Sequence, residues 1–125
     1  MARKTVLVIE DSEDYCRVLS LRLRKDGLKV LTAHDGEKGL KLAKERIPDV
    51  ILLDLNLPRL SGEEVCKAIK EGGDETLAQI PIIMLTGKDS DADHVIGKSL
   101  GACQYLYKPF KADELLREIH ECLQP

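Results

Sequence analysis

The feature that most constrains the fold is a regular alternation of short apolar runs with segments of helical period along the 125 residues. Several runs are nearly continuous in Val, Ile and Leu, which is typical of strands covered on both faces. Five strand–helix units in series require a parallel sheet wrapped by helices. The sequence therefore predicts an α/β, doubly wound fold with strands at Thr5–Ile9, Lys29–Ala33, 50–53, 82–85 and Gln104–Tyr107.

Apolar residues recur at helical spacing between these runs. Four helices are predicted, with apolar faces marked in turn by Tyr15, Val18, Leu19 and Leu23; by Leu40, Ala43 and Ile47; by Val65, Ala68 and Ile69; and by Leu115, Leu116, Ile119 and Leu123. A further helix is expected over residues 89–100, where the apolar face is thin and Gly97 lies inside. We expect that helix to be the least stable element. No structure is assigned to residues 72–80.

Composition and charge narrow the class of protein. A net charge of -3 gives no general reason to bind nucleic acid, which usually requires a basic face. No apolar run approaches the roughly 20 residues that span a bilayer, and the N-terminus does not resemble a signal peptide.

The four cysteines are scattered without a C-x-x-C pair and are expected to be reduced packing residues: Cys16, Cys66, Cys103 and Cys122. We expect one cytoplasmic domain over residues 1–125, with no output domain and no membrane contact.

Polar side chains follow four of the predicted strands. Glu10 and Asp11 follow the first strand, Asp54 the third and Thr86 the fourth, while the fifth runs into Lys108. Ligands of open parallel sheets bind at the carboxyl ends of the strands. The sequence therefore gathers three carboxylates, a hydroxyl and an ammonium group at one edge of the sheet.

This set of groups suits phosphoryl transfer. Carboxylates this close repel one another unless a divalent cation lies between them, and oxygen ligands suit Mg²⁺. Asp54 follows the middle strand and is the candidate nucleophile that would form an acyl phosphate. Lys108 and Thr86 would stabilise the transferred phosphoryl group. Taken singly, Glu10 and Asp11 could be a solvated helix cap and Asp54 an Asx-turn residue; the joint arrangement is the specific signal.

Four ordered stretches carry a family resemblance: VLVIEDSED, DVILLDLNLPRLSG, IPIIMLTG and GACQYLYKPF. Along essentially its whole length the chain resembles the receiver domains of two-component response regulators. The resemblance implies a flavodoxin-like sheet of strand order 2-1-3-4-5. It also implies that a sensor histidine kinase or a histidine phosphotransfer protein phosphorylates Asp54, and that the chain is not an enzyme in the ordinary sense, although it catalyses its own phosphorylation and dephosphorylation.

The same resemblance assigns roles at the site. Mg²⁺ would be bound directly by Asp11 and Asp54, by the backbone carbonyl of Asn56, and by Glu10 through water. Thr86 and Lys108 would contact the phosphoryl oxygens, and Lys108-Pro109 would be a cis peptide. Tyr105 would be the aromatic switch residue that follows Thr86 on phosphorylation.

Phosphorylation is then expected to change the surface formed by the fourth helix, the fifth strand and the fifth helix. That surface would bind a downstream protein or a second copy of the chain. Lys88 and Asn56 lie two residues beyond Thr86 and Asp54, and they either tune dephosphorylation or are solvated residues at the edge. His34, His94 and His120 are isolated and are expected to have surface or packing roles.

Three other functions are alternatives for this chain. A haloacid-dehalogenase-type phosphatase would need a second Asp two residues after its nucleophile, where this chain has Asn56. A flavodoxin-like cofactor binder would need a phosphate-cradling loop after the first strand, where the acidic segment EDSED would repel phosphate. The remaining alternative is a protein-binding module on a receiver scaffold that is not phosphorylated.

Overall fold

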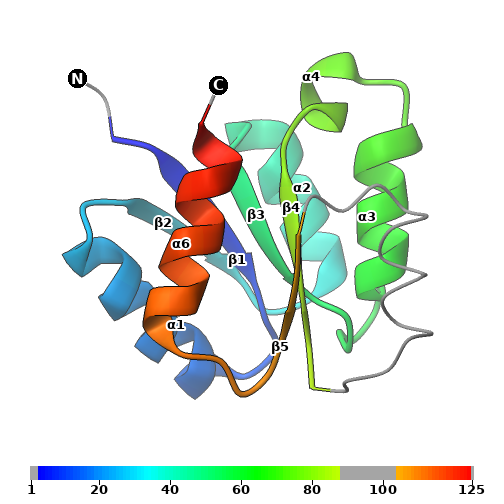
Figure 1. Cartoon of the computed structure of the whole chain (residues 1–125). Helices are drawn as coiled ribbons and strands as arrows, with labels where there is room; N and C mark the ends of the chain where they lie inside the picture. The colour runs from blue at the N-terminus through cyan, green and yellow to red at the C-terminus, as the bar shows by residue number, and fades with distance from the viewer. Residues whose placement is uncertain (1–2, 88–103, 125) are drawn as a thin grey trace.

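A computed structural model of the chain describes residues 3–87 and 104–124. It shows a five-stranded parallel sheet of order β2-β1-β3-β4-β5 with helices on both sides (Figure 1). In chain order the elements are β1 (Thr5–Ile9), α1 (Glu13–Lys25), β2 (Lys29–Ala33), α2 (Gly36–Arg46), β3 (Val50–Asp54), α3 (Gly62–Glu71), α4 (Glu75–Ala78), β4 (Ile82–Thr86), β5 (Gln104–Tyr107) and α6 (Ala112–Leu123). The predicted fold class and strand order are confirmed.

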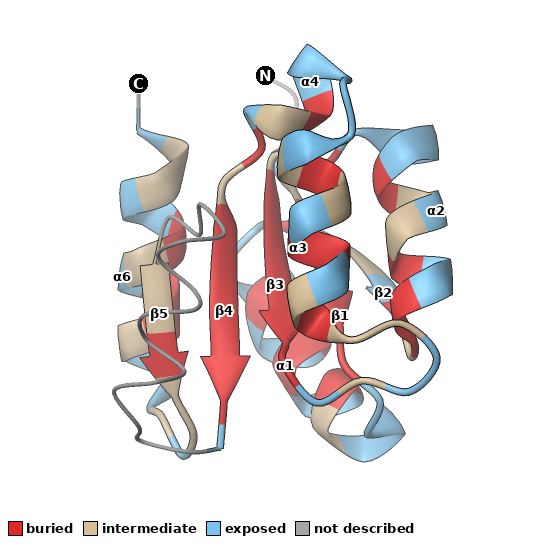
Figure 2. Ribbon diagram, turned by 90° about the vertical axis from the view of Figure 1, so that its right-hand side faces the viewer, coloured by how far each residue is buried: buried red, intermediate tan, exposed pale blue. Residues whose placement is uncertain are grey.

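The strands at the centre of the sheet are buried along their whole length. Every residue of β3 and β4 is buried (Figure 2). This explains the continuous apolar runs, because successive side chains point to opposite faces and both faces are covered. β3 and β4 each extend one residue further than predicted, so Asp54 and Thr86 are the last residues of their strands.

Two apolar cores lie on the two faces of the sheet. On one face, alternate strand residues such as Leu52 pack against α1 and α6 through Leu23 and Ile119. On the other face, neighbouring residues such as Leu53 pack against Ala43 of α2 and Val65 of α3. Strand pairing fixes the register of the strand ends, which positions the site, and the helices cover both faces of the sheet.

Two apolar side chains depart from the predicted helix faces. Val18 was predicted on the buried face of the first helix, yet it is 66% exposed, and Ser20 is buried instead. Ile47 lies beyond the end of α2 at a left-handed C-cap with φ of 43°, and it is 40% exposed. Both predictions were wrong because helical period alone fixes neither the exact rotation of a helix nor its last residue.

The segment left unassigned over residues 72–80 contains the short helix α4. Asp74 caps it, since its carboxylate accepts hydrogen bonds from the backbone N–H groups of Thr76 and Leu77. The ammonium group of Lys70, on α3, donates to the carbonyl oxygens of Ala78 at 2.9 Å and Ile80 at 2.7 Å. This side chain therefore ties α4 to α3.

Three of the four cysteines lie among the described residues, and each is a free thiol: Cys16, Cys66 and Cys122. Burial raises the pKa of Cys66 to about 11, so it is protonated at neutral pH. Within residues 3–87 and 104–124, the helices are too short or too polar to cross a membrane. The helix predicted over residues 89–100, together with Lys88, His94 and Cys103, lies outside the described residues.

Candidate functional site

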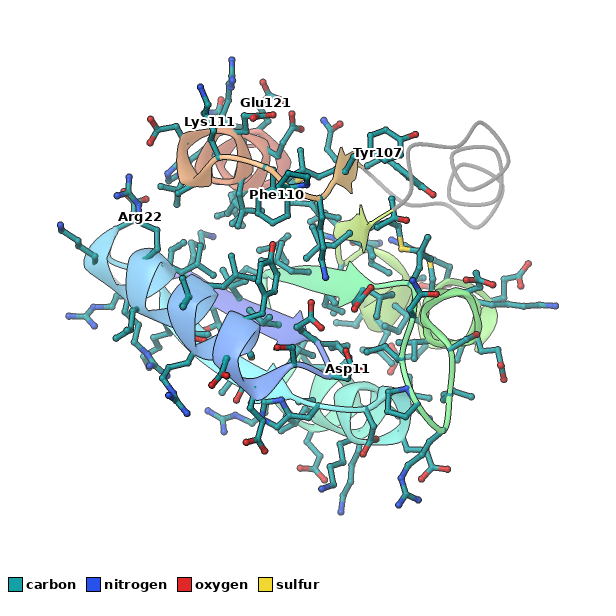
Figure 3. All side chains as sticks on the ribbon, turned by 90° about the horizontal axis from the view of Figure 1, so that it is seen from below. Asp11, Arg22, Tyr107, Phe110, Lys111 and Glu121 are labelled. Carbon is teal, nitrogen blue, oxygen red and sulfur yellow. The ribbon has the colours of Figure 1, made fainter. Side chains whose placement is uncertain are left out.

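The carboxyl ends of β1 and β3 bring three acidic side chains together. Carboxylate oxygens of Glu10, Asp11 and Asp54 all lie within 4.8 Å of one another. Glu10 and Asp54 are almost fully buried, whereas Asp11 is exposed at the surface (Figure 3). β1 and β3 are adjacent in the sheet, with Ile9 paired to Leu53, so the residues that follow are forced together. The predicted cluster is therefore present.

The electrostatics of this cluster favour a cation. The hydrogen bond with Glu10, together with burial and the negative charge of Glu10, raises the pKa of Asp11. The ionised form of Asp11 is thus disfavoured by its neighbour, and a divalent cation would relieve the repulsion. Oxygen donors from carboxylates are the ligands that Mg²⁺ prefers. The residues present therefore fit a magnesium ion.

Lys108 crosses to the same cluster from the loop after β5. Its ammonium nitrogen lies 2.5 Å from Oε1 of Glu10 and 3.5 Å from Oδ2 of Asp54. Burial lowers the pKa of Lys108, but the hydrogen bond to Glu10 and the nearby carboxylates outweigh it, and the net shift is upward. Lys108 is consequently a cation placed next to the candidate nucleophile. Its shorter contact is with Glu10, a pairing that the sequence did not predict.

Backbone hydrogen bonds fix the remaining predicted site residues. The backbone N–H of Asn56 donates to Oδ1 of Asp54 at 3.1 Å, which orients the carboxylate. The backbone N–H of Lys108 donates to the carbonyl oxygen of Thr86 at 2.6 Å. Thr86 is buried at the end of β4, the strand next to β3. The structure therefore brings Thr86, Lys108 and Asn56 to the edge where Asp54 lies.

The predicted switch residue lies on β5, one strand further along. Tyr105 is half-buried against the core that includes Met84, its register partner on β4. Its ring centroid lies 5.4 Å from that of Tyr107. Lys108-Pro109 is a cis peptide, as the resemblance implied.

Gly62, at the start of α3, is a site-building residue that the sequence analysis missed. A Cβ at this position would lie 2.7 Å from Cα of Leu55 and would press into the backbone carbonyl of Asp54. Only glycine lets α3 approach the end of β3 this closely. The signal was present in the stretch DVILLDLNLPRLSG, where Gly62 is the last residue, but its reason is a tertiary contact.

Tyr15, on α1, was predicted only as an apolar helix residue. Its ring lies beneath the ammonium group of Lys108, with Nζ 4.5 Å from the ring centroid. Burial raises the pKa of Tyr15, the positive charge of Lys108 lowers it, and the net shift is upward. Sequence spacing gives no sign of this contact, because the two residues lie on elements that are far apart in the chain.

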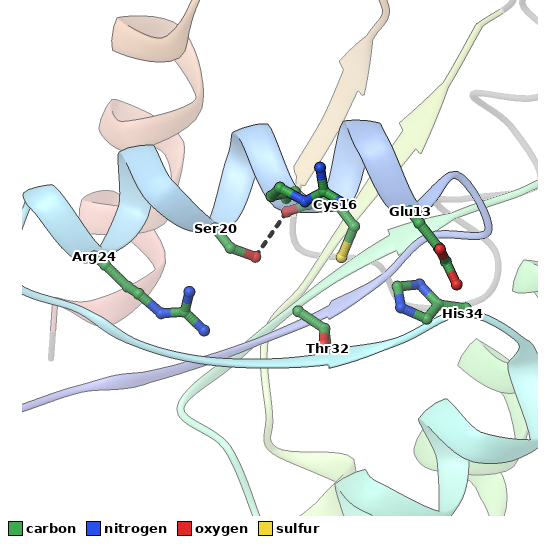
Figure 4. Close-up of a pocket in the computed structure, with 7 residues that line it drawn as sticks. Glu13, Cys16, Ser20, Arg24, Thr32 and His34 are labelled. Atoms are coloured by element: carbon green, nitrogen blue, oxygen red, sulfur yellow. Dashed lines mark hydrogen bonds between the residues drawn. The ribbon is translucent and has the colours of Figure 1, made fainter.

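A separate pocket of about 240 Å³ lies between α1 and β2 (Figure 4). It is lined by Glu13, Cys16, Arg17, Ser20, Arg24, Thr32 and His34. None of the site residues predicted from the sequence lines it. The hydroxyl of Ser20 donates to the carbonyl oxygen of Cys16 at 2.7 Å, an interaction within the helix.

The two described histidines are not part of the carboxylate cluster of Glu10, Asp11 and Asp54. Nδ1 of His34 lies 3.1 Å from the carbonyl oxygen of Glu10, and Nε2 of His120 lies 2.9 Å from Oδ2 of Asp26. Within the described parts of the chain, neither belongs to a group of side chains that could hold a metal.

Comparison with known proteins agrees with this geometry. The family model for the response regulator receiver domain matches residues 6–120. The alkaline phosphatase synthesis transcriptional regulatory protein PhoP of Bacillus subtilis is 40% identical over 121 residues, covering 97% of this chain and 49% of that protein. The chain thus spans about half the length of this curated relative.

Solved structures share both the fold and the sequence pattern. Chemotaxis protein CheY4 of Vibrio cholerae is 34% identical, with a TM-score of 0.90 over 98% of this chain and 100% of that one. The receiver domain of sensor histidine kinase PA1611 from Pseudomonas aeruginosa is 31% identical, with a TM-score of 0.89 over 98% of both chains. That structure has a magnesium ion coordinated in the active site cleft. On the extent of the family match and on these relatives, the chain belongs to the response regulator receiver domain family.

Proposed function

We propose that this chain is a phosphoacceptor switch in which Asp54 takes a phosphoryl group from a phosphohistidine of a sensor histidine kinase or a histidine phosphotransfer protein. The observation that carries the proposal is the placement of Asp54. Its carboxylate is buried at the end of a central strand, 3.5 Å from the Lys108 ammonium and beside two further carboxylates. A buried nucleophile with a cation beside it is suited to phosphoryl transfer.

In the proposed reaction a carboxylate oxygen of Asp54 attacks phosphorus. The P–N bond of the phosphohistidine breaks, and its electron pair goes to the imidazole nitrogen of the donor. The hydrogen bond from Asn56 N–H to Oδ1 orients the carboxylate and leaves Oδ2 on the side of Lys108. Lys108 and the hydroxyl of Thr86 would then stabilise charge on the phosphoryl oxygens.

Mg²⁺ would be held by Asp11, Asp54, the carbonyl of Asn56 and, through water, Glu10, and when bound it supplies positive charge to the transferring phosphoryl group. The ion pair between Glu10 and Lys108 suggests that Glu10 and Asp11 have different roles. Glu10 keeps the ammonium at the edge of the sheet, and Asp11 is the more accessible carboxylate. Hydrolysis of the acyl phosphate at the same site would reset the switch, and Asn56 and Lys88 are candidates for setting its rate.

The output would be a change in the surface formed by residues 89–100, β5 and α6, which a downstream protein or a second copy of the chain would bind. Tyr105 would couple the site to this surface by following Thr86. Tyr105→Ala is expected to leave phosphorylation intact and to reduce phosphorylation-dependent partner binding. Unaltered binding by this variant would contradict the aromatic coupling step.

The test is incubation with acetyl phosphate and Mg²⁺, followed by intact-mass analysis of the wild type and Asp54→Asn. A labile gain of one phosphoryl mass in the wild type alone, lost with EDTA, is expected. If neither acetyl phosphate nor a phosphorylated histidine kinase labels the folded protein, the chain is instead a binding module that is not phosphorylated.

A further inference from the structure

The ring of Tyr15 is a third neighbour of the Lys108 ammonium, in addition to the carboxylates of Glu10 and Asp54. Nζ of Lys108 lies 4.5 Å from the ring centroid, within the range at which an aromatic face attracts a cation. Lys108 is three-quarters buried, so this attraction is less screened by water than that of a surface pair.

Two further contacts place Tyr15, one through its backbone and one through its ring. Its backbone N–H donates to the Ser12 hydroxyl at the start of α1, at 3.2 Å. Its ring meets the ring of Phe110 edge to face, with centroids 6.2 Å apart and an interplanar angle of 74°. Phe110 lies two residues beyond Lys108, in the same loop (Figure 3). Tyr15 and Phe110 thus join α1 to the loop that carries the lysine.

We propose that Tyr15 is a positioning residue for Lys108: its ring holds the ammonium group at the carboxylate cluster so that it remains beside Asp54. The inference rests on the proposed function for its consequence in phosphorylation. The contact itself is present without a phosphoryl group on Asp54, so it can be tested independently of phosphorylation.

The physical need for such a residue follows from the contacts of Lys108. The ammonium lies nearer to Glu10, at 2.5 Å, than to Asp54, at 3.5 Å. The flexible four-carbon stem of lysine would let the ammonium shift between these two carboxylates if nothing else held it. A ring face attracts the ammonium without competing with Asp54 for its N–H donors, as a further carboxylate would. The Tyr15 ring therefore holds the Lys108 ammonium where it reaches both carboxylates.

Two substitutions separate the ring from the bulk of the side chain. Tyr15→Phe keeps the aromatic face and the packing on Phe110, whereas Tyr15→Leu keeps apolar bulk but removes the face. With acetyl phosphate and Mg²⁺, we expect Tyr15→Leu to lower the maximal rate of Asp54 phosphorylation about three- to ten-fold. Tyr15→Phe is expected to react within about two-fold of the wild type.

A second readout does not depend on phosphorylation. Trace acetylation of lysines by acetic anhydride, quantified by peptide mass, reports how accessible and how basic each amine is. Lys108 is expected to react about three- to ten-fold faster in Tyr15→Leu than in the wild type, and Tyr15→Phe should restore slow reaction. Lys70 is the internal control, because its ammonium donates to the carbonyl oxygens of Ala78, at the end of α4, and Ile80, just before β4. The acetylation rate of Lys70 should not change.

Unchanged acetylation of Lys108 in Tyr15→Leu would overturn the inference, as would equal changes in Tyr15→Phe and Tyr15→Leu. A wild type that no phosphodonor labels would refute the proposed function, and the acetylation ratio of Lys108 to Lys70 would still decide the role of Tyr15. Thermal unfolding of both variants shows whether a change in rate reflects loss of the fold. A lower unfolding midpoint in Tyr15→Leu with an unaltered acetylation ratio would mean that Tyr15 only packs.

Discussion

At the scale of single residues, the ionised side chain of Asp11 lowers the stability of the fold. Its folded-state pKa is raised above 3.8, chiefly by the hydrogen bond with Glu10. An acid with a raised folded pKa destabilises the fold as pH rises from the unfolded to the folded pKa, and the loss is complete above both. The repulsion is thus fully present at neutral pH.

We therefore expect Asp11→Asn to be more stable than the wild type at pH 7 without divalent cations, by on the order of 0.5 kcal/mol after allowance for solvent screening at this exposed side chain. The gain should disappear below the unfolded pKa of about 3.8. Urea unfolding across pH 3–7 checks this. Asp14→Asn is the control, because Asp14 is almost fully exposed and its ion pair is with Arg17, outside the carboxylate cluster. An equal gain in both variants would contradict the assignment to the carboxylate cluster.

Gly62 shows how a residue without a side chain shapes the site. Gly62→Ala would place a methyl group against the backbone of Asp54 and Leu55, so α3 or the end of β3 must shift. We expect a loss of about 1–3 kcal/mol in the free energy of unfolding, the range for overpacking.

Gly87→Ala is the matched control, because a Cβ at Gly87 meets no atom of the described residues within 4 Å. It should change the stability by less than about 0.5 kcal/mol. Chemical denaturation of the two variants measures the difference. If Gly62→Ala is as stable as Gly87→Ala, the close approach of α3 to Asp54 is not a constraint.

At the scale of elements, α4 depends on α3 through Lys70. Its ammonium donates to two carbonyl oxygens at the end of α4 and just beyond it. Lys70→Met keeps most of the stem but removes both charge-assisted hydrogen bonds, each of which contributes about 1.5–3 kcal/mol in favourable cases. Because Lys70 is half-buried, we expect a net loss of about 1–3 kcal/mol and faster amide hydrogen exchange in α4. Lys67→Met, on the exposed side of the same helix, should have little effect on either measurement.

At the scale of the whole molecule, the carboxylate cluster would couple cation binding to folding. The cluster joins Glu10 and Asp11, which follow β1, to Asp54, the last residue of β3, so it exists only when the sheet is formed. A cation that binds the folded chain alone stabilises it by mass action, by about 1.4 kcal/mol at ten times the dissociation constant. Mg²⁺ should therefore raise the unfolding midpoint of the wild type, and EDTA should reverse the rise. Asp11→Asn should respond less; an equal Mg²⁺ response in that variant would place the ion elsewhere.

Much of the fold and of the site could be predicted from the sequence because both depend on local pattern. The apolar runs fix which segments are strands, and in a parallel sheet the residues after the strands meet at one edge. Glu10, Asp11 and Asp54 were found by that rule, and the family resemblance supplied the strand order. These features require no knowledge of how side chains pack.

Only the tertiary structure decided the contacts between distant segments. The pairing of Lys108 with Glu10 and the Tyr15 ring beneath the ammonium join elements that are far apart in the chain. The close approach of α3 to the end of β3, which leaves no room for a Cβ at Gly62, is likewise a contact between two packed elements. The exposure of Val18 and the helix α4 were settled in the same way, by helix rotation and by a lysine reaching two carbonyl oxygens. The sequence by itself determined which chemical groups gather at the edge of the sheet. Their partners and distances were decided by packing, because packing depends on the shapes of both sides of a contact, and a linear pattern records only one side at a time.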